Sequence, residues 1–450
     1  MQTKLRDLLT SEQKGEGRKS PSPSPHLEFY HREDRLDFSQ WNYYRQLFEQ
    51  SCWVGVEIEI ALPRGKKREE FFEQLINYFH PTGNYKFWGR YGIYQIVTEH
   101  CGIEFQLIGI KPSWVLQRDQ FREIFSYLLE EGARTKGTCG IHFHFSVPSS
   151  KSIPELILAN LWNLTRRYAP SLKYLASAGE KLNALCRRRN HNSHLELIRL
   201  NPLLQSMREI QARLKDSNLV PMHQNFLNIE HIEFDSHGDI KTFHFEYRFL
   251  DADLSPTSVC AKVGLCYALL LRAVDLSQYG LVQEGSIERW KRQIELLDKL
   301  SNNDGTLAFS DTSLIGEGEL KELREQSKEL LTFLKPTLEG QGFLPAWRVL
   351  RFLVDNPISL LRSRGWEWKD IELVLERVAE REEQGELSSR LLKIIDLMEL
   401  TGAPSPEKWK EMASQWLSCN RYWLERQLKK IKEKRELLWD PKLGSYRFRS

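Results

Sequence analysis

The sequence predicts an α+β protein whose chemistry lies on a sheet. Three segments far apart in the chain, residues 54–60, 137–146 and 243–249, alternate apolar residues with polar and ionisable ones. Successive side chains of a strand point to opposite faces, so each segment is expected to bury one face and to present a polar one. Segments with apolar residues at helical spacing separate these strands and follow them. A core of strands and helices is therefore expected at about residues 51–282.

The composition indicates a globular protein. With 450 residues, 41% of them hydrophobic and 11% aromatic, the chain can form one large or two to three ordinary domains. Its net charge of +3 does not favour nucleic acid or a membrane surface. Seven scattered cysteines without a C-x-x-C pair are typical of a reduced protein. We see neither a signal peptide nor a membrane-spanning segment, and so expect a cytoplasmic location.

Three regions are expected along the chain. In the first, residues 1–50, repeated Ser-Pro pairs predict a flexible leader, and the aromatic residues that follow should pack onto the core. Residues 51–282 form the α+β core, and residues 283–450 form a charged helical region. Residues 421–450 carry ten basic and four acidic side chains. They could bind nucleic acid, but glutamates interrupt the basic run and favour a charged helix that packs through its aromatic residues.

The first two strands present carboxylates and histidines. Glu57 and Glu59 share one face of the first strand, while His142, His144 and Ser146 share one face of the second. Carboxylates are hard oxygen ligands that suit Mg²⁺, and imidazole can complete such a site. Each pattern also has a simpler interpretation. Glu-x-Glu is most often the solvated face of a strand, and His-x-His is either ordinary or a zinc pair.

The third strand places His244, Glu246 and Arg248 on one face, and Glu104 lies in a further predicted strand. A glutamate two residues before an arginine is most often a surface ion pair. The same pair can also offset charge on phosphoryl or carboxylate oxygens. If the strands share one sheet, these side chains would suit Mg²⁺–nucleotide chemistry. Cys139 could be a nucleophile, but a small residue before a strand is the simpler interpretation.

The remaining elements follow from apolar spacing and turn residues. Two or three strands are expected within 84–110 and more within 223–250. The helix at 257–277 is apolar nearly all round, so it should be buried against the sheet. Further helices are expected at 72–79, 118–131, 152–173 and 194–215.

Four short motifs, in this order, resemble the amidoligase family. They are Gly-Val-Glu-Ile-Glu from residue 55, Glu-Phe-Gln-Leu-Ile-Gly from residue 104, Cys-Gly-Ile-His-Phe-His from residue 139 and Phe-Glu-Tyr-Arg-Phe from residue 245. Members of this family are ATP-dependent carboxylate–amine ligases similar to glutamine synthetase and glutamate–cysteine ligase. The resemblance covers roughly residues 52–260. It implies an antiparallel sheet curved around the active site, with helices on its outer face.

The resemblance also implies roles for individual residues. The implied metal ligands are Glu57, Glu59, Glu104, His142 and Glu246. His144 would lie near the nucleotide phosphates, and Arg248 would bind a phosphoryl oxygen or the acceptor carboxylate. Glu57, Glu59 and Arg248 would be the catalytic residues, with ATP and Mg²⁺, or Mn²⁺, as cofactors. Asn228 is a loose match to an asparagine found upstream of the last motif.

The implied reaction joins a carboxylate to an amine through an acyl phosphate. The substrates are not determined by the sequence, although the large helical region makes a peptide or protein somewhat more attractive. The oligomeric state is also undetermined. The main alternative is a ligase-like binding or scaffold protein that acts through its helical region. A zinc hydrolase and a nucleic-acid binder are further alternatives.

Overall fold

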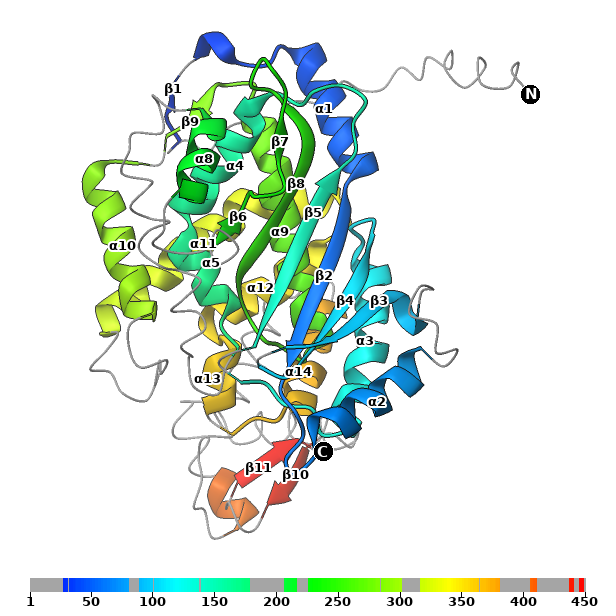
Figure 1. Ribbon diagram of the computed structural model, residues 1–450. Helices are drawn as coiled ribbons and strands as arrows, with labels where there is room; N and C mark the ends of the chain where they lie inside the picture. The colour runs from blue at the N-terminus through cyan, green and yellow to red at the C-terminus, as the bar shows by residue number, and fades with distance from the viewer. Residues whose placement is uncertain are drawn as a thin grey trace, which may run out of the picture.

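The structure of the chain is a computed structural model, and it describes residues 27–30, 32–80, 89–99, 101–136, 139–178, 206–216, 226–283, 285–301, 316–363, 365–380, 405–410, 437–440 and 445–448. These residues form a mixed α/β structure around a seven-stranded antiparallel sheet (Figure 1). The sheet is open, with the strand order β3-β4-β2-β5-β8-β6, and β7 pairs with β8. Its strands are β2 (Trp53–Ile60), β3 (Ile93–Thr98), β4 (Ile103–Ile110), β5 (Gly140–Val147), β6 (Leu227–Asn228), β7 (Glu233–Phe234) and β8 (Ile240–Asp251).

The other described elements are helices and two small strand pairs. The helices are α1 (Phe38–Ser51), α2 (Arg68–Phe79), α3 (Trp114–Glu130), α4 (Glu155–Arg167), α5 (Ala169–Ala176), α8 (Met207–Asp216), α9 (Pro256–Leu276), α10 (Ile287–Ser301), α11 (Glu317–Gly340), α12 (Leu344–Asp355), α13 (Ile358–Ser363) and α14 (Trp368–Glu380), with 3₁₀ turns η1 (Arg32–Asp34) and η2 (Arg90–Gly92). The strand pairs are β1 (Phe29–Tyr30) with β9 (Leu281–Val282), and β10 (Leu437–Asp440) with β11 (Ser445–Phe448).

Aromatic residues on the apolar face of the sheet pack against helices. Phe145 of β5 stacks on Phe245 of β8 with ring centroids 5.4 Å apart, and on Tyr267 of α9 at 6.5 Å. Phe48 of α1 meets Phe243 of β8 edge to face at 5.0 Å. Such rings bury large apolar areas, which stabilise the contact between sheet and helices. Figure 1 shows α9 behind β5 and β8, and α9 is buried along its whole length, as predicted.

Helix α9 is the centre of the helical layer. It packs against α1, α3, α4, α11, α12 and α14. Gly264 permits the contact with the start of α12, because a Cβ at this position would lie 2.6 Å from the ring of Phe343. The aromatic N-terminal arm docks on α9, where Trp41 Nε1 donates to Asp275 at 3.2 Å. The packing predicted for this arm is confirmed.

Several predicted helices have different bounds. The helix expected at 152–173 is two helices, α4 and α5, which divide at Tyr168. Pro170 has no N–H to donate, so it cannot continue the hydrogen-bond ladder of α4. The helix expected from residue 118 begins at Trp114, and the described part of the helix expected at 194–215 is α8.

The C-terminal region is helical in α10 to α14, but the prediction of helix to the end of the chain is wrong. Strands β10 and β11 pair in antiparallel fashion, with Trp439 opposite Tyr446. The sequence between them contains Pro441 and Gly444, which both disfavour a continuous helix. The rest of the basic tail and the Ser-Pro leader lie outside the described residues.

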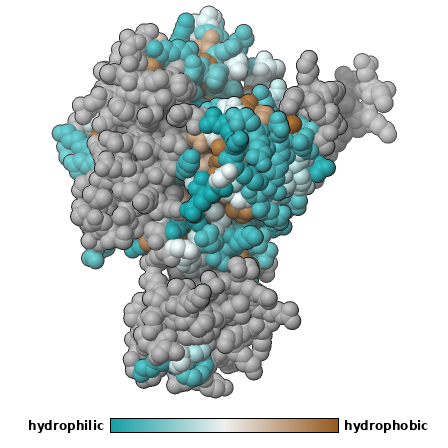
Figure 2. Space-filling model, turned by 60° about the horizontal axis from the view of Figure 1, so that its bottom comes forward, coloured by the Kyte–Doolittle hydropathy of each residue, from teal (hydrophilic) through white to brown (hydrophobic). Residues whose placement is uncertain are grey.

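One face of the described surface is largely polar. On the face seen in Figure 2, hydrophilic residues dominate and hydrophobic ones appear as small separate spots. Scattered exposed apolar residues are normal for folded proteins. Within the described residues, no helix has both the length and the apolar content that crossing a membrane requires.

Candidate functional site

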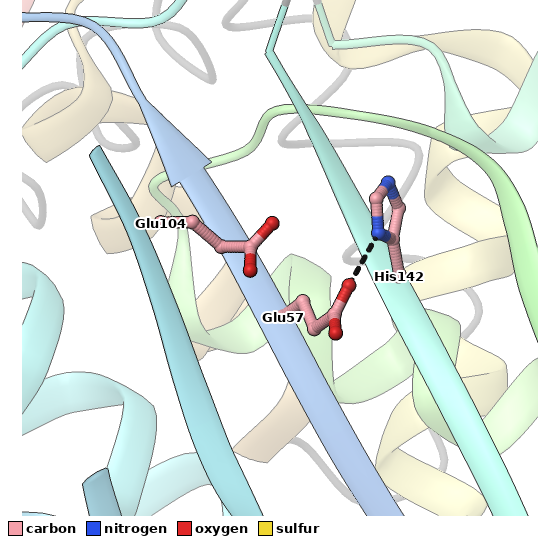
Figure 3. Close-up of side chains that lie close together, drawn as sticks. All are labelled: Glu57, Glu104 and His142. Carbon is pink, nitrogen blue, oxygen red and sulfur yellow. Dashed lines mark hydrogen bonds and ion pairs between the residues drawn. The ribbon is translucent and has the colours of Figure 1, made fainter. Parts of the chain in front are cut away.

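Strand pairing gathers carboxylates and histidines on one face of the sheet. Glu57 on β2 lies opposite His142 on β5, and Glu59 lies opposite Glu104 on β4. Residues opposite each other in an antiparallel pair share a face, so three neighbouring strands contribute to one site. Figure 3 shows the Glu57 carboxylate turned towards the imidazole of His142, whose Nδ1 lies 2.7 Å from Glu57 Oε2. The predicted faces of the first two strands therefore meet.

Strand β8 adds a third side to this cluster. Its Glu246 lies opposite His144 and is 2% exposed. The Glu246 carboxylate accepts a hydrogen bond from Asn228 Nδ2 at 3.1 Å and a second one from Nη1 of Arg248. Its Oε1 also lies 3.3 Å from His142 Nδ1 and 3.7 Å from His144 Nε2. Glu246 therefore contacts both histidines of β5.

The donor atoms form two groups that share one carboxylate. One group consists of Glu57, Glu104 and His142, the other of Glu57, His144 and Glu246, and within each group the ligand atoms lie within 4.8 Å of one another. The two histidines of β5 thus belong to different groups. This arrangement does not favour a zinc pair made by His-x-His alone. It would suit two cation positions that share Glu57, with oxygen and nitrogen ligands available at each.

Hydrogen bonds orient the carboxylates on the β4 side of the cluster. The backbone N–H of Gly140 donates to Glu59 Oε2 at 2.6 Å, which leaves Oε1 3.6 Å from His142 Nε2. Gln106 Nε2 donates to Glu104 Oε1 at 2.8 Å. Glu59 therefore lies against the cluster without belonging to either group. Its predicted role as a metal ligand stays a prediction.

The cluster holds more negative than permanent positive charge. Burial alone would raise the pKa of Glu57, but hydrogen bonds and charge from His142 and His144 outweigh it and hold this pKa well below its usual range. Burial, followed by the charge of Glu57, raises the pKa of Glu104 to about 7, against the hydrogen bond from Gln106. A cation bound beside Glu104 would favour its ionised form, because an opposite charge offsets the charge of Glu57.

The two histidines on the other side of the cluster have opposite pKa shifts. Burial would lower the pKa of His144, but the hydrogen bond with Glu57 and the charges of Glu246 and Glu57 raise it. Burial and the nearby His144 and His231 lower the pKa of His244 to about 4. His244 is therefore neutral near pH 7, with one ring nitrogen free to accept a hydrogen bond.

All seven residues that the sequence analysis selected lie in this one cluster. The structure assigns no role to them by itself, but it brings together Glu57, Glu59, Glu104, His142, His144, Glu246 and Arg248. Asn228, a loose match in sequence, hydrogen-bonds Glu246.

Two residues near the cluster were not predicted from the sequence. Gln106 lies two positions after Glu104 on the same face of β4, so strand alternation could have identified it. His231 lies in a turn, where the sequence has no motif that would point to it. Cys139 is buried in a small cluster with Cys101, which supports the simpler interpretation of that residue.

Comparisons with known proteins add little. No protein-family model matches this chain, and no curated protein matches it. Among solved structures, the crystal structure of the complex between the prokaryotic ubiquitin-like protein Pup and its ligase PafA matches with a TM-score of 0.35 and 11% sequence identity, over 78% of this chain and 84% of that chain. A similarity of this size carries no argument about fold or activity. The function proposed below therefore rests on the residues of this chain.

Proposed function

We propose that the chain is an ATP-dependent carboxylate–amine ligase. The observation that carries this proposal is the convergence of four adjacent strands, β4, β2, β5 and β8, on one cluster of carboxylates and imidazoles beside Arg248. The motifs on these strands occur in the order that resembles amidoligases. Four carboxylates, from Glu57, Glu59, Glu104 and Glu246, face a single guanidinium in the described cluster. This excess of negative charge suits divalent cations and the phosphates they accompany.

The donor set fits Mg²⁺ or Mn²⁺. Both cations prefer carboxylate oxygens, and Mn²⁺ also accepts imidazole readily. Glu57, Glu104 and His142 would hold one cation, and Glu57, His144 and Glu246 a second. When bound, the cations supply charge neutralisation to the phosphates of ATP.

Arg248 is placed to bind an anionic substrate group. One of its amino groups donates to Glu246, while its buried Nε has no hydrogen-bond partner among the described residues. A guanidinium offers several N–H donors in a fixed plane and therefore suits phosphoryl or carboxylate oxygens. We assign to Arg248 the orientation of the γ-phosphoryl group or of the substrate carboxylate. The hydrogen bonds of Glu246 to Arg248 and Asn228 hold this pair in place.

The reaction proceeds in two balanced steps. A carboxylate oxygen of the substrate attacks the γ-phosphorus of ATP, the bond to the β-phosphate oxygen breaks, and ADP leaves with that electron pair. The nitrogen of an amine then attacks the carbonyl carbon of the acyl phosphate. The C–O bond breaks, inorganic phosphate leaves, and one proton passes from the nitrogen to the solvent. ATP is needed because a carboxylate anion is a poor electrophile.

The helical C-terminal region favours a large substrate. Helices α10 to α14 follow the sheet in sequence, and α11, α12 and α14 pack on α9, so this region is anchored to the layer behind the site. Large accessory surfaces suit large partners. We therefore include peptides and proteins as well as free amino acids among the carboxylates and amines to be tested.

The test is nucleotide turnover with product mass. The purified full chain is incubated with ATP and Mg²⁺ against pools of amino acids, peptides and proteins. We expect ADP together with a product lighter by one water than its two substrates. Glu57→Gln should reduce the rate at least about 100-fold, the scale of losing one group that stabilises transition-state charge. Glu233→Gln, an exposed carboxylate on β7, is the matched control and should leave the rate unchanged.

Two results would contradict the ligase. The first is ATP turnover that Glu57→Gln leaves at the wild-type rate, since the activity would then come from another site or a contaminant. The second is metal-dependent ATP binding without turnover against every substrate pool. That result would favour a ligase-like binding or scaffold protein.

A further inference from the structure

A second histidine lies directly behind one of the candidate metal ligands. Nδ1 of His144 and Nε2 of His244 are 3.3 Å apart, within hydrogen-bonding distance. His244 belongs to β8 and faces the site side of the sheet, because it lies opposite Ser146 two positions from the His144–Glu246 pair. The ring of His231 stacks on His244, with centroids 5.2 Å apart and the planes 23° from parallel. Nε2 of His144 thus contacts carboxylates, while its Nδ1 contacts the imidazole of His244.

The hydrogen bond between the two rings determines which nitrogen of His144 is available. A neutral imidazole has one N–H donor and one acceptor nitrogen. Nε2 of His144 lies 3.3 Å from Glu57 Oε1 and 3.7 Å from Glu246 Oε1, in the second donor group. To bind a cation, Nε2 must present its lone pair, so Nδ1 must carry the proton and donate it. Nε2 of His244 is placed to accept that hydrogen bond.

We propose that His244 is a positioning residue that sets the tautomer of His144 and so prepares Nε2 of His144 for a divalent cation. The proposal rests on the metal site of the proposed function. Histidine ligands commonly donate their other N–H to a carboxylate or a carbonyl, and losing that partner typically weakens metal binding about 10–100-fold. Here an imidazole takes this place. His244 lies just outside the four motifs, and its role is to act through His144.

An imidazole partner differs from a carboxylate because it can both accept and donate. Without a cation, His244 Nε2–H can donate to His144 Nδ1, while His144 Nε2–H faces Glu57. With a cation, the proton between the two rings moves to His144 Nδ1. His144 Nε2 then loses its proton and His244 Nδ1 gains one, so the number of protons on the pair is unchanged. The pair can therefore satisfy His144 in both states.

The test measures Mn²⁺ binding by electron paramagnetic resonance, which does not depend on catalysis. His244→Phe keeps a ring of similar size against His231 but has no nitrogen. His244→Gln removes the ring but keeps an amide that can accept or donate near the position of Nε2. His237→Ala, an exposed histidine in the turn before β8, is the matched control. Thermal unfolding of each variant shows that it is folded.

We expect His244→Phe to weaken one of the two classes of Mn²⁺ site about 10–100-fold. His244→Gln and His237→Ala should stay within about threefold of wild type. Wild-type affinity in His244→Phe would overturn the proposal. Equal losses in the Phe and Gln variants would also overturn it, because a side chain that can hydrogen-bond at this position would then support the site no better than one that cannot. If wild type binds no Mn²⁺, the metal site of the proposed function is wrong. If wild type binds Mn²⁺ and His244→Phe binds it equally well, only the role of His244 is wrong.

A second measurement reads the tautomer directly. In protein labelled with ¹⁵N-histidine and saturated with diamagnetic Mg²⁺, long-range ¹H–¹⁵N correlations distinguish a protonated Nδ1 from a protonated Nε2. We expect His144 to carry its proton on Nδ1, and His244→Phe to lose this preference. A proton on Nε2 of His144 in the Mg²⁺-saturated wild type would contradict the proposal.

Discussion

Two buried charged clusters lie five residues apart on one strand and its continuation, and they are built differently. In the cluster around Glu246, several carboxylates share one positively charged side chain, Arg248. Their excess negative charge lies on the site face of the sheet. Asp251, the last residue of β8, pairs with Lys173 at 3.2 Å, and beyond the strand Asp253 pairs with Lys262 at 2.6 Å. There each carboxylate has its own ammonium. The balanced cluster needs no further charge, whereas the surplus negative charge of the unbalanced one suits the cations that we propose.

The balanced cluster also satisfies its remaining polar atoms. Asp253 accepts hydrogen bonds from the Ser255 backbone N–H at 2.8 Å and from Ser258 Oγ at 2.6 Å. Lys173 donates to the carbonyl of Phe249 at 2.8 Å. Buried ion pairs of this kind stabilise only when hydrogen bonds replace the lost water. The comparison indicates that this cluster stabilises the fold, whereas the surplus carboxylates of the other are available for the metal binding that we propose.

The largest expected effect comes from breaking a balanced pair. Lys262→Met leaves the Asp253 carboxylate buried without a cation, so the free energy of unfolding should fall by about 3–5 kcal/mol. Denaturant unfolding of the metal-free protein measures it. Adding Asp253→Asn in the same chain should restore part of the loss. Glu57→Gln, in the unbalanced cluster, should change stability far less, and equal losses in the two variants would break the comparison.

The next effect is a pH dependence from Glu104. Its pKa of about 7 in the folded protein lies above its ordinary value of 4.5, so the folded state holds this proton more tightly than the unfolded chain. The resulting stabilisation is complete below pH 4.5 and is lost as the pH rises through 7. Glu104→Gln cannot ionise, and at pH 8 without metal it should be more stable than wild type by on the order of 3 kcal/mol.

The Glu104 comparison is made at two pH values and with metal. At pH 4.5 to 5 the two proteins should unfold at similar temperatures. Saturating Mg²⁺ at pH 8 should reverse the order, because it stabilises the form that binds it. A wild type that is more stable than Glu104→Gln at pH 8 in the presence of a chelator would show that the surplus charge is already neutralised within the protein.

The smallest expected change in stability concerns Glu372, which lies beside the balanced cluster. Glu372 of α14 caps the N-terminus of α9, where it accepts hydrogen bonds from Ser255 Oγ and from the backbone N–H of Thr257 at 3.2 Å. Burial raises the pKa of Glu372 to about 7 against these hydrogen bonds. Glu372→Ala should lower the free energy of unfolding by about 1–2 kcal/mol. Glu372→Gln keeps an acceptor and should lose less, and denaturant unfolding distinguishes the two.

The polar faces could be predicted from the sequence, but their register could not. Side chains two positions apart on a strand share a face, so the sequence alone predicts that Glu57 lies beside Glu59 and His142 beside His144. Pairing of His144 with Glu246 depends on contacts between segments about a hundred residues apart and on an irregularity in the β5–β8 ladder. The family resemblance supplied the expectation that these strands share a sheet.

Other features were hidden because they depend on tertiary contacts. Lys173 and Lys262 are charged residues in helical segments, and only the packing of α5 and α9 shows that both are buried. His231 became a neighbour of His244 through a turn without a motif. The β10–β11 pair was missed because the charged composition of the tail outweighed its alternating aromatic residues and its proline and glycine.

The central claim is that the unbalanced cluster binds divalent cations. Isothermal titration of the metal-free full chain with Mg²⁺ at pH 8 tests it most directly, with Glu57→Gln and Glu233→Gln measured alongside. We predict saturable binding to wild type and to Glu233→Gln, and at least about tenfold weaker binding to Glu57→Gln, which removes the negative charge of the residue shared by both groups. No saturable binding to wild type, or equal binding to Glu57→Gln, would contradict the account.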